Sequence, residues 1–128
     1  MVIKMGNTIQ RQKILETINN SKKHYTVEEI HEKVSLEIPN ISLGTVYRNL
    51  NILVEQKMIK PIHVLNQPIR YDNNTDNHDH LICKKCFKVE DIPPIKLDYS
   101  TIENIPNNID SHTVFLYHIC NDCKSKLD

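Results

Sequence analysis

All four cysteines of this 128-residue chain fall into two pairs, each with two residues between its members. The pairs are Cys83 with Cys86 and Cys120 with Cys123. Two intervening residues let both sulfurs of a pair approach one ion from a tight turn, and two such turns complete a tetrahedral zinc shell. The competing interpretation is a thioredoxin-like redox pair, but that expects a single pair inside a βαβ pattern. The spacing therefore predicts a structural Zn²⁺ site.

A second set of possible ligands contains no sulfur. His78 and His80 stand two residues apart, with Asp72 before them and Asp91 after them. Histidines at this spacing on an extended segment share one face, and imidazole with carboxylate suits Fe²⁺, Mn²⁺ or Zn²⁺. A polar loop with surface histidines explains the spacing equally well. His24 precedes a predicted helix cap. Taken alone, it is interpreted as a solvated surface histidine.

Three helices and a hairpin are predicted in the first part of the chain. The helices are expected over 8–19, from a capping box at Thr26 to about residue 36, and after a cap at Ser42. The third helix has an apolar stripe made of Leu43, Val46, Leu50 and Leu53. Strands over 62–65 and 69–71 form the hairpin. This order is typical of a winged helix-turn-helix, whose third helix reads the major groove of DNA.

The second part of the chain is predicted to be a small α/β domain. Its expected elements are strands over 80–82, 88–92 and 113–119 and a short helix over 98–105. The polar residues 72–77 favour turns and are interpreted as a hinge. The predicted fold is therefore α+β, with a winged-helix DNA-binding domain over 1–71, the hinge over 72–77, and a dimerisation and metal-binding domain over 78–128 carrying the four-cysteine zinc site.

Charge and hydropathy agree with a DNA-binding protein outside the membrane. Residues 1–72 carry ten Lys or Arg against seven acids, and the remainder carries six against nine, so a +3 part precedes a −3 part. No apolar run approaches the roughly 18 residues that span a bilayer. A signal-peptide pattern is also absent from the N-terminus. We therefore expect a cytoplasmic protein with no membrane partner.

Motifs along nearly the whole chain resemble the ferric uptake regulator (Fur) superfamily of bacterial metalloregulators. They are T-x-Q-R at 8–11, S-L-G-T-V-Y-R-N-L at 42–50, R-Y-D at 70–72, H-D-H-L-I-C-K-K-C at 78–86 and H-I-C-N-D-C at 118–123. The chain is most similar to the peroxide-stress regulator (PerR) branch, because Asp72 and Asp91 stand where the iron-uptake branch has glutamate.

The resemblance implies a homodimeric, metal-dependent repressor of inverted-repeat operators in double-stranded DNA, and no enzymatic activity. It implies that regulatory Fe²⁺ or Mn²⁺ is bound by His24, Asp72, His78, His80 and Asp91. Peroxide, the only small molecule expected to react, would oxidise His24 or His78 through bound Fe²⁺. Mn²⁺ would act as an alternative, peroxide-insensitive corepressor.

The resemblance also assigns DNA contacts and a further metal site. Tyr47 matches a tyrosine that meets thymine methyl groups, and Arg48 is placed to reach a phosphate or guanine, with Thr45 and Asn49 beside them on the third helix. Partial burial beside Val46 is the alternative for Tyr47. The auxiliary metal site of the family would use Asp79, Asp98 and His112, although Asn77 replaces a common histidine there. Phe87 stands where the family usually has glycine.

Three other functions compete with peroxide sensing. One is an iron- or zinc-availability regulator of the same superfamily. Another is a zinc-stabilised module that binds protein and not DNA. The third is a thiol oxidoreductase that uses Cys83 and Cys86.

Overall fold

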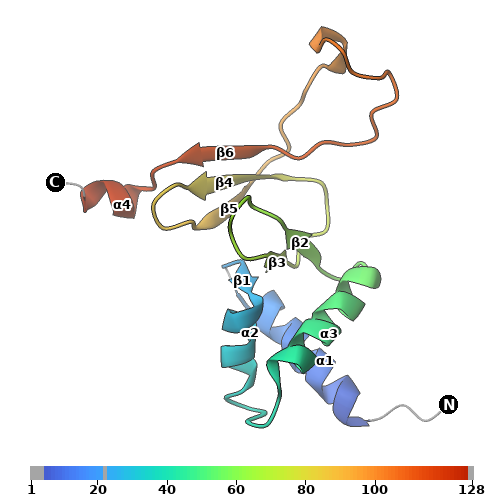
Figure 1. Cartoon of the computed structure of the whole chain (residues 1–128), viewed down its shortest axis with the longest axis vertical. Helices are drawn as coiled ribbons and strands as arrows, with labels where there is room; N and C mark the ends of the chain where they lie inside the picture. The colour runs from blue at the N-terminus through green and yellow to red at the C-terminus, as the bar shows by residue number, and fades with distance from the viewer. Residues whose placement is uncertain (1–4, 22, 127–128) are drawn as a thin grey trace. The chain divides into compact units, whose positions relative to one another are not determined.

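The structure is a computed structural model that describes residues 5–21 and 23–126. The chain divides into two compact units between Thr75 and Asp76, within the segment predicted to be a hinge. The first unit contains α1 (Met5–Asn19), β1 (Tyr25–Thr26), α2 (Val27–Val34), α3 (Leu43–Glu55), β2 (Lys60–Ile62) and β3 (Arg70–Asp72) (Figure 1). The second contains β4 (Asp79–Cys83), β5 (Val89–Ile92), the 3-10 helix η1 (Tyr99–Thr101), β6 (Phe115–His118) and α4 (Asn121–Ser125).

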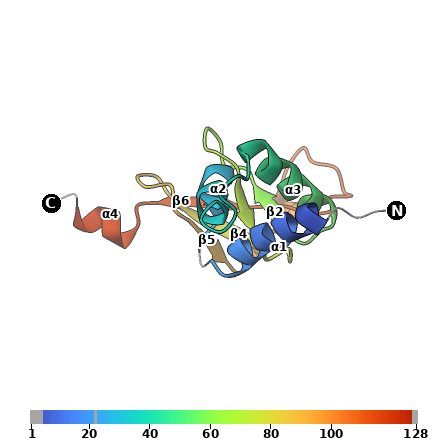
Figure 2. The ribbon, with the colours of Figure 1, turned by 90° about the horizontal axis from the view of Figure 1, so that it is seen from below.

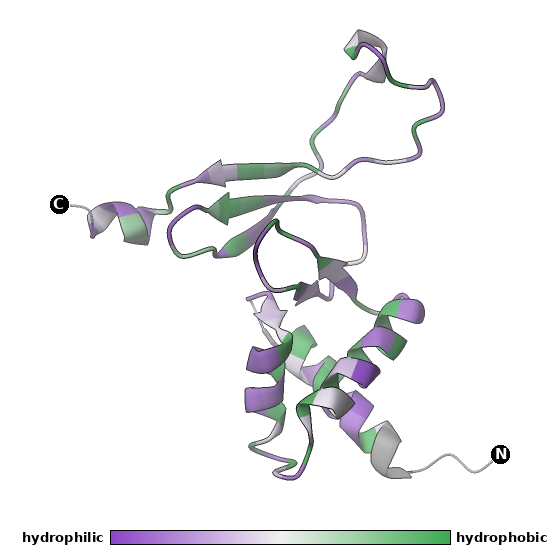
Figure 3. Cartoon of the chain, in the orientation of Figure 1, coloured by the Kyte–Doolittle hydropathy of each residue, from purple (hydrophilic) through white to green (hydrophobic). Residues whose placement is uncertain are grey.

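The three helices of the first unit enclose its core. They pack against one another pairwise and lie together in both views (Figures 1 and 2). Their hydrophobic faces turn inward (Figure 3), and the most deeply buried side chains there are Ile14, Ile30, Val34, Val46, Leu50 and Leu53. Burying a side chain of this size stabilises the fold by roughly 1.5–3 kcal/mol. Packing of the three helices therefore stabilises this unit.

Local capping explains where α2 and α3 begin. The Thr26 hydroxyl accepts the Glu29 N–H and the Glu29 carboxylate accepts the Thr26 N–H, which is the predicted capping box. Ser42 likewise accepts the Thr45 N–H at the start of α3. These bonds satisfy backbone donors that have no partner within the helix.

A small antiparallel sheet completes the first unit, in the order β1-β3-β2. Strands β2 and β3 are the predicted hairpin, so the helices and hairpin of a winged helix-turn-helix are confirmed. The sequence did not predict β1, which pairs Tyr25 with Tyr71 and Thr26 with Arg70.

Several predicted boundaries in the first unit were wrong. Helix α1 begins three residues earlier than predicted, α2 ends at Val34, and the first hairpin strand begins at Lys60 instead of residue 62. Leu43, predicted on the apolar stripe of α3, is 43% exposed because it is the first residue of the helix, before the buried stripe begins at Val46.

The second unit is built on a three-stranded sheet in the order β5-β4-β6. Strand β4 pairs antiparallel with β5 through a short turn and parallel with β6. Parallel neighbours need a long connection, and here residues 93–114 leave the sheet, carry η1, and return to β6 (Figure 1).

The helix predicted over 98–105 is wrong. Only the single turn η1 forms, because Ile102 is already extended and Asn104 adopts a left-handed backbone with φ 64° just before Pro106. The short helix α4, which begins immediately after Cys120, was not predicted.

Replacing Thr26 by alanine should lower the free energy of unfolding of the first unit by about 1 kcal/mol, because the Glu29 N–H loses its acceptor. Chemical denaturation followed by circular dichroism measures this change. Thr26→Ser is the matched control, since it keeps the hydroxyl and should restore most of the loss. Equal stabilities of the Ala and Ser variants would contradict the capping role.

Candidate metal centres

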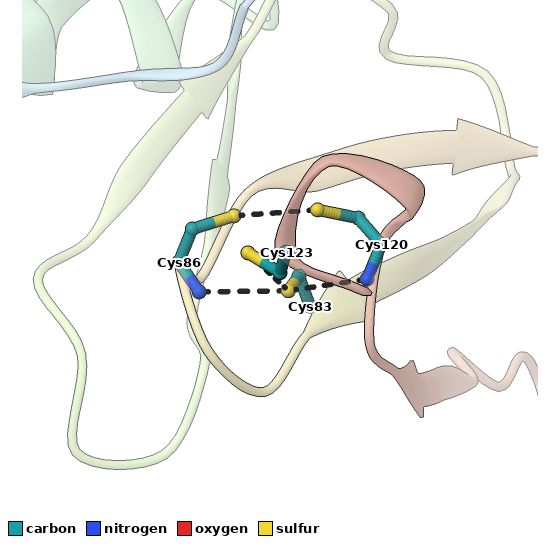
Figure 4. A group of neighbouring side chains, drawn as sticks. All are labelled: Cys83, Cys86, Cys120 and Cys123. Carbon is teal, nitrogen blue, oxygen red and sulfur yellow. Dashed lines mark hydrogen bonds between the residues drawn. The ribbon is translucent and has the colours of Figure 1, made fainter. Parts of the chain in front are cut away.

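The four cysteine sulfurs gather at one end of the second sheet (Figure 4). All four Sγ atoms lie within 4.8 Å of one another. The Cys83 and Cys123 sulfurs are 3.7 Å apart and those of Cys86 and Cys120 are 3.9 Å apart. Tetrahedral zinc with bonds of about 2.3 Å requires sulfurs about 3.8 Å apart, whereas a disulfide requires about 2.05 Å. The spacing fits a zinc ion and does not fit disulfides.

Backbone donors prepare Cys83 to bind a cation. Its buried sulfur accepts N–H groups from Cys120, Cys86 and Lys85, which lower the pKa of the thiol to about 5 despite the opposing effect of burial. The pKa of Cys123 is raised to about 12. The largest cause is the neighbouring Cys120 sulfur, followed by burial and by the sulfurs of Cys83 and Cys86. Four thiolates this close cannot all remain charged without a cation among them. The site therefore has the chemistry of a structural Zn²⁺ centre.

The two turns that carry the cysteines have different backbones. Cys83 ends β4, and the turn to β5 closes with the Phe87 N–H donating to the Cys83 carbonyl at 2.9 Å. Phe87 has φ 62°, the left-handed conformation that glycine adopts without cost. The turn that places Cys86 therefore keeps the backbone expected for glycine even though a phenylalanine occupies it. Cys120 instead precedes α4, whose first turn carries Cys123.

In the first unit, the pairing of β1 with β3 brings His24 to Asp72. Tyr25 lies opposite Tyr71 in this antiparallel pair, so the residue before Tyr25 meets the residue after Tyr71. His24 Nε2 accordingly lies 3.8 Å from Asp72 Oδ2. Arg70 donates to the His24 carbonyl at 2.7 Å, which holds the backbone of that histidine on the sheet. Sequence reasoning missed this role of Arg70. The only signal was the R-Y-D motif itself.

In the second unit, both histidine rings converge on one aspartate. Asp91 lies opposite His80 in the β4–β5 ladder, and its Oδ1 is 3.1 Å from His78 Nε2 and 3.3 Å from His80 Nε2. The ring centroids of His78 and His80 are 4.7 Å apart. His78 Nδ1 lies 2.7 Å from the Asp76 carbonyl, so Nδ1 can donate to that carbonyl while Nε2 is available to bind a metal ion.

An imidazole nitrogen and a carboxylate oxygen at this distance are placed as two ligands of one cation would be. Metal bonds of about 2.1 Å at right angles place neighbouring ligands about 3.0 Å apart, close to the two distances at Asp91. Imidazoles and an aspartate suit Fe²⁺, Mn²⁺ or Zn²⁺. The residues of the second unit thus fit a divalent cation, and the first unit offers a further imidazole and carboxylate at His24 and Asp72.

The residues of the auxiliary site are not brought together. Among the described residues, Asp79, Asp98 and His112 do not form a group whose ligand atoms converge. The Asp98 carboxylate accepts the N–H and hydroxyl of Ser100, while the His112 ring contacts Tyr99 Oη and the Ile95 carbonyl. Burial raises the pKa of Asp79, but N–H donors from Ile95 and Val114 outweigh it, so the net pKa is lowered.

The predicted DNA-contacting residues lie on α3 but differ in exposure. Tyr47 is 42% exposed, Arg48 is exposed and Thr45 is half-buried. Asn49 is only 5% exposed, and its amide donates to the Thr45 carbonyl and accepts from Arg11 Nε of α1. Its side chain is therefore engaged inside the unit, whereas that of Tyr47 is accessible.

The winged-helix unit is followed by a sheet with four clustered cysteines, so this chain is in the class of metal-binding winged-helix proteins. The Ferric uptake regulator family model matches residues 3–123. The peroxide-responsive repressors PerR of Staphylococcus epidermidis and Staphylococcus saprophyticus are 33% and 34% identical over 124 residues, covering 93% of this chain and 81% and 82% of those proteins. The chain therefore belongs to the ferric uptake regulator family, and it is a metal-responsive transcriptional regulator.

Solved structures agree with this assignment. The Campylobacter jejuni peroxide stress regulator is 32% identical, with a TM-score of 0.69, and the match covers 93% of this chain and 92% of that one. The Helicobacter pylori ferric uptake regulator Fur has the same fold, with a TM-score of 0.76 at 24% identity over 91% of this chain and 80% of that one.

Within residues 5–21 and 23–126, no helix is long and apolar enough to cross a membrane.

Purified protein should contain one Zn²⁺ per chain, and Cys86→Ser should lose it because only three thiolates remain around the ion. Zinc analysis measures the stoichiometry, and hydrogen exchange should show faster exchange of β4 and β6 amides with little change in α1–α3. Phe87→Gly is the matched control on the same turn, since it keeps all four sulfurs and relieves the left-handed backbone. Full zinc retention by Cys86→Ser would contradict the four-cysteine site.

Proposed function

We propose that this chain is a metal-dependent transcriptional repressor that senses peroxide through iron-catalysed oxidation of a histidine ligand. The observation that carries the proposal is the pairing of ligands within each unit: His24 with Asp72, and His78 and His80 with Asp91. Together they supply three imidazole nitrogens and two aspartates. We infer that one Fe²⁺ or Mn²⁺ ion is bound by all five, in addition to the structural Zn²⁺.

Sharing one ion between the two units would give metal binding a mechanical effect. Residues 73–77, which join the units, are short polar residues that favour turns, so they impose little orientation by themselves. Ligands from both sides would fix that orientation. In a dimer this sets the separation of the two α3 helices, which must match half-sites about 34–36 Å apart.

The peroxide response follows from the ligand chemistry. Bound Fe²⁺ would catalyse the reaction of hydrogen peroxide with a ring carbon of His24 or His78. The O–O bond would break, one oxygen atom would be inserted at the ring carbon and the other would leave as water, so the histidine ring supplies the two electrons and Fe²⁺ is regenerated. The oxidised ring is a poor ligand, so the site loses one of its five ligands. Reversing a 99:1 preference between two states requires a differential binding of about 5.5 kcal/mol, to which each ligand contributes.

DNA binding is assigned to the exposed face of α3. We propose that Tyr47, Arg48 and Thr45 contact the operator in the cytoplasm, whereas Asn49 positions α3 through Arg11. A homodimer is supported by apolar side chains exposed on the edge strand β6 and on the 93–114 segment, where a second copy would cover them. They are Leu97, Ile102, Leu116 and Tyr117, each more than 40% exposed.

Treating the Fe²⁺-loaded protein with a low concentration of hydrogen peroxide should add one oxygen atom to the peptide containing His24 or His78 and release operator DNA. Peptide mass spectrometry and fluorescence anisotropy measure the two effects. The Mn²⁺-loaded protein is the control and should remain unmodified and bound. Asp91→Glu, which keeps the charge, should retain metal-dependent DNA binding but lose much of the oxidation, because the resemblance associates glutamate here with iron uptake.

Unmodified histidines together with DNA binding that simply follows the concentration of iron or zinc would favour an availability regulator of the same family. Failure to bind any inverted-repeat DNA in the presence of Mn²⁺ would favour a zinc-stabilised protein-binding module.

Tyr47→Ala should weaken operator binding by about 1–3 kcal/mol, because the ring is accessible on α3 and its loss removes an apolar contact with thymine methyl groups. Anisotropy titrations with Mn²⁺-loaded protein measure this loss. Tyr47→Phe keeps the ring and should bind almost normally. If Tyr47→Ala bound DNA as tightly as the unmodified protein, Tyr47 would not lie in the interface.

A further inference from the structure

Asp79, the first residue of β4, lies between His78 and His80 and is a buried carboxylate with two backbone partners. It is 1% exposed, its Oδ2 accepts the Ile95 N–H at 2.6 Å, and its Oδ1 accepts the Val114 N–H at 2.7 Å. Ile95 and Val114 are the points at which the segment 95–114 leaves the sheet and returns to it. One side chain therefore joins both ends of the long connection between β5 and β6.

A second set of contacts joins the two limbs of the segment 95–114. His112 Nε2 lies 2.8 Å from the Ile95 carbonyl, and His112 Nδ1 lies 2.5 Å from Tyr99 Oη. The ring can donate to the carbonyl through Nε2 while Nδ1 accepts the tyrosine hydroxyl. Ile95 is thus held at its N–H by Asp79 and at its carbonyl by His112, so the carboxylate connects through Ile95 to Tyr99.

His78 immediately before β4 and His80 within it are the histidines of the regulatory centre. Side chains alternate along this extended segment, so the rings of His78 and His80 reach Asp91 on one face while Asp79 turns to the other. The backbone N–H of His80 also donates to the Val114 carbonyl at 3.1 Å. The carbonyl of Val114 therefore accepts the N–H of His80, and the N–H of Val114 donates to the side chain of the adjacent Asp79.

We propose that Asp79 is a positioning residue that couples the regulatory metal centre to the segment 95–114. This inference rests on the proposed function, because it requires His78 and His80 to bind the regulatory ion. Through Asp79, a fixed 95–114 segment holds β4 with both rings aimed at Asp91. By reciprocity, an ion that fixes the rings stabilises the segment, which carries the exposed Leu97 and Ile102. Metal binding would thereby be transmitted to an apolar surface of the second unit.

Both oxygens of the carboxylate are needed for this role. Each accepts a different buried N–H, and an amide in its place offers one acceptor and turns its own N–H group toward the second donor. Leaving a buried donor without an acceptor is costly, so Asp79→Asn should release one end of the segment 95–114. Asp110 provides a matched control. Its side chain lies in the same segment but is exposed to solvent.

The test uses the full-length, zinc-loaded protein and measures Mn²⁺ affinity together with hydrogen exchange of the 95–114 amides, with and without Mn²⁺. In the unmodified protein Mn²⁺ should slow exchange across this segment. Asp79→Asn should weaken Mn²⁺ binding by about 10–100-fold, the range typical of residues that orient metal ligands. It should also abolish the slowing, while one Zn²⁺ per chain is retained. Asp110→Asn should leave Mn²⁺ affinity unchanged.

The outcomes separate this inference from the proposed function. Unchanged Mn²⁺ affinity in Asp79→Asn, with the unmodified protein binding normally, would overturn the coupling and leave peroxide sensing intact. Failure of the unmodified protein to bind Mn²⁺ would overturn both. If Asp79→Asn loses zinc or unfolds, Tyr99→Phe decides the question, because it removes only the hydroxyl at His112. A smaller loss of Mn²⁺ affinity with faster exchange of the segment supports the coupling, and no change in either overturns it.

Discussion

The alternation of side chains along β4 is the constraint on which the second unit depends. His80 faces Asp91, Asp79 faces the opposite side, and Cys83 ends the strand among the other sulfurs. A shift of the β4 register by one residue would exchange these faces and separate every ligand from its partners. The parallel pair β4–β6 is held against such a shift at both ends, by the Asp79 bond to Val114 and by the cysteine cluster.

The parts of the fold that sequence predicted are those governed by neighbouring residues. Thr26 and Glu29 form their capping box within four residues, and the buried stripe of α3 follows helical spacing from Val46 onward. Each cysteine pair likewise carries its geometry in its own turn, so the four-sulfur cluster was predicted from spacing. The closeness of the His78 and His80 rings required only an extended segment, which β4 and the residue before it provide.

The parts that sequence did not predict depend on residues far apart in the chain. His24 meets Asp72 only because β1 pairs with β3, whose residues lie more than 40 positions later. Two residues are also too short a strand to give a periodic pattern. The role of Asp79 depends on two backbone N–H groups at 95 and 114, which no side-chain pattern reveals. The motif assigned Asn49 to the DNA-contacting residues, but Arg11 of another helix donates to its amide oxygen, and Asn49 is buried.

The parallel pairing of β4 with β6 has a consequence for the order in which the protein folds during synthesis. All residues of the first unit have been made when Thr75 leaves the ribosome, so its helices can pack at once. The second sheet cannot close until β6 and Cys123 emerge roughly 50 residues later, a delay of about 2–10 s at usual rates of translation. During that interval Cys83 and Cys86 form only half of the zinc site, so the four-sulfur site cannot be completed before the last cysteine is made.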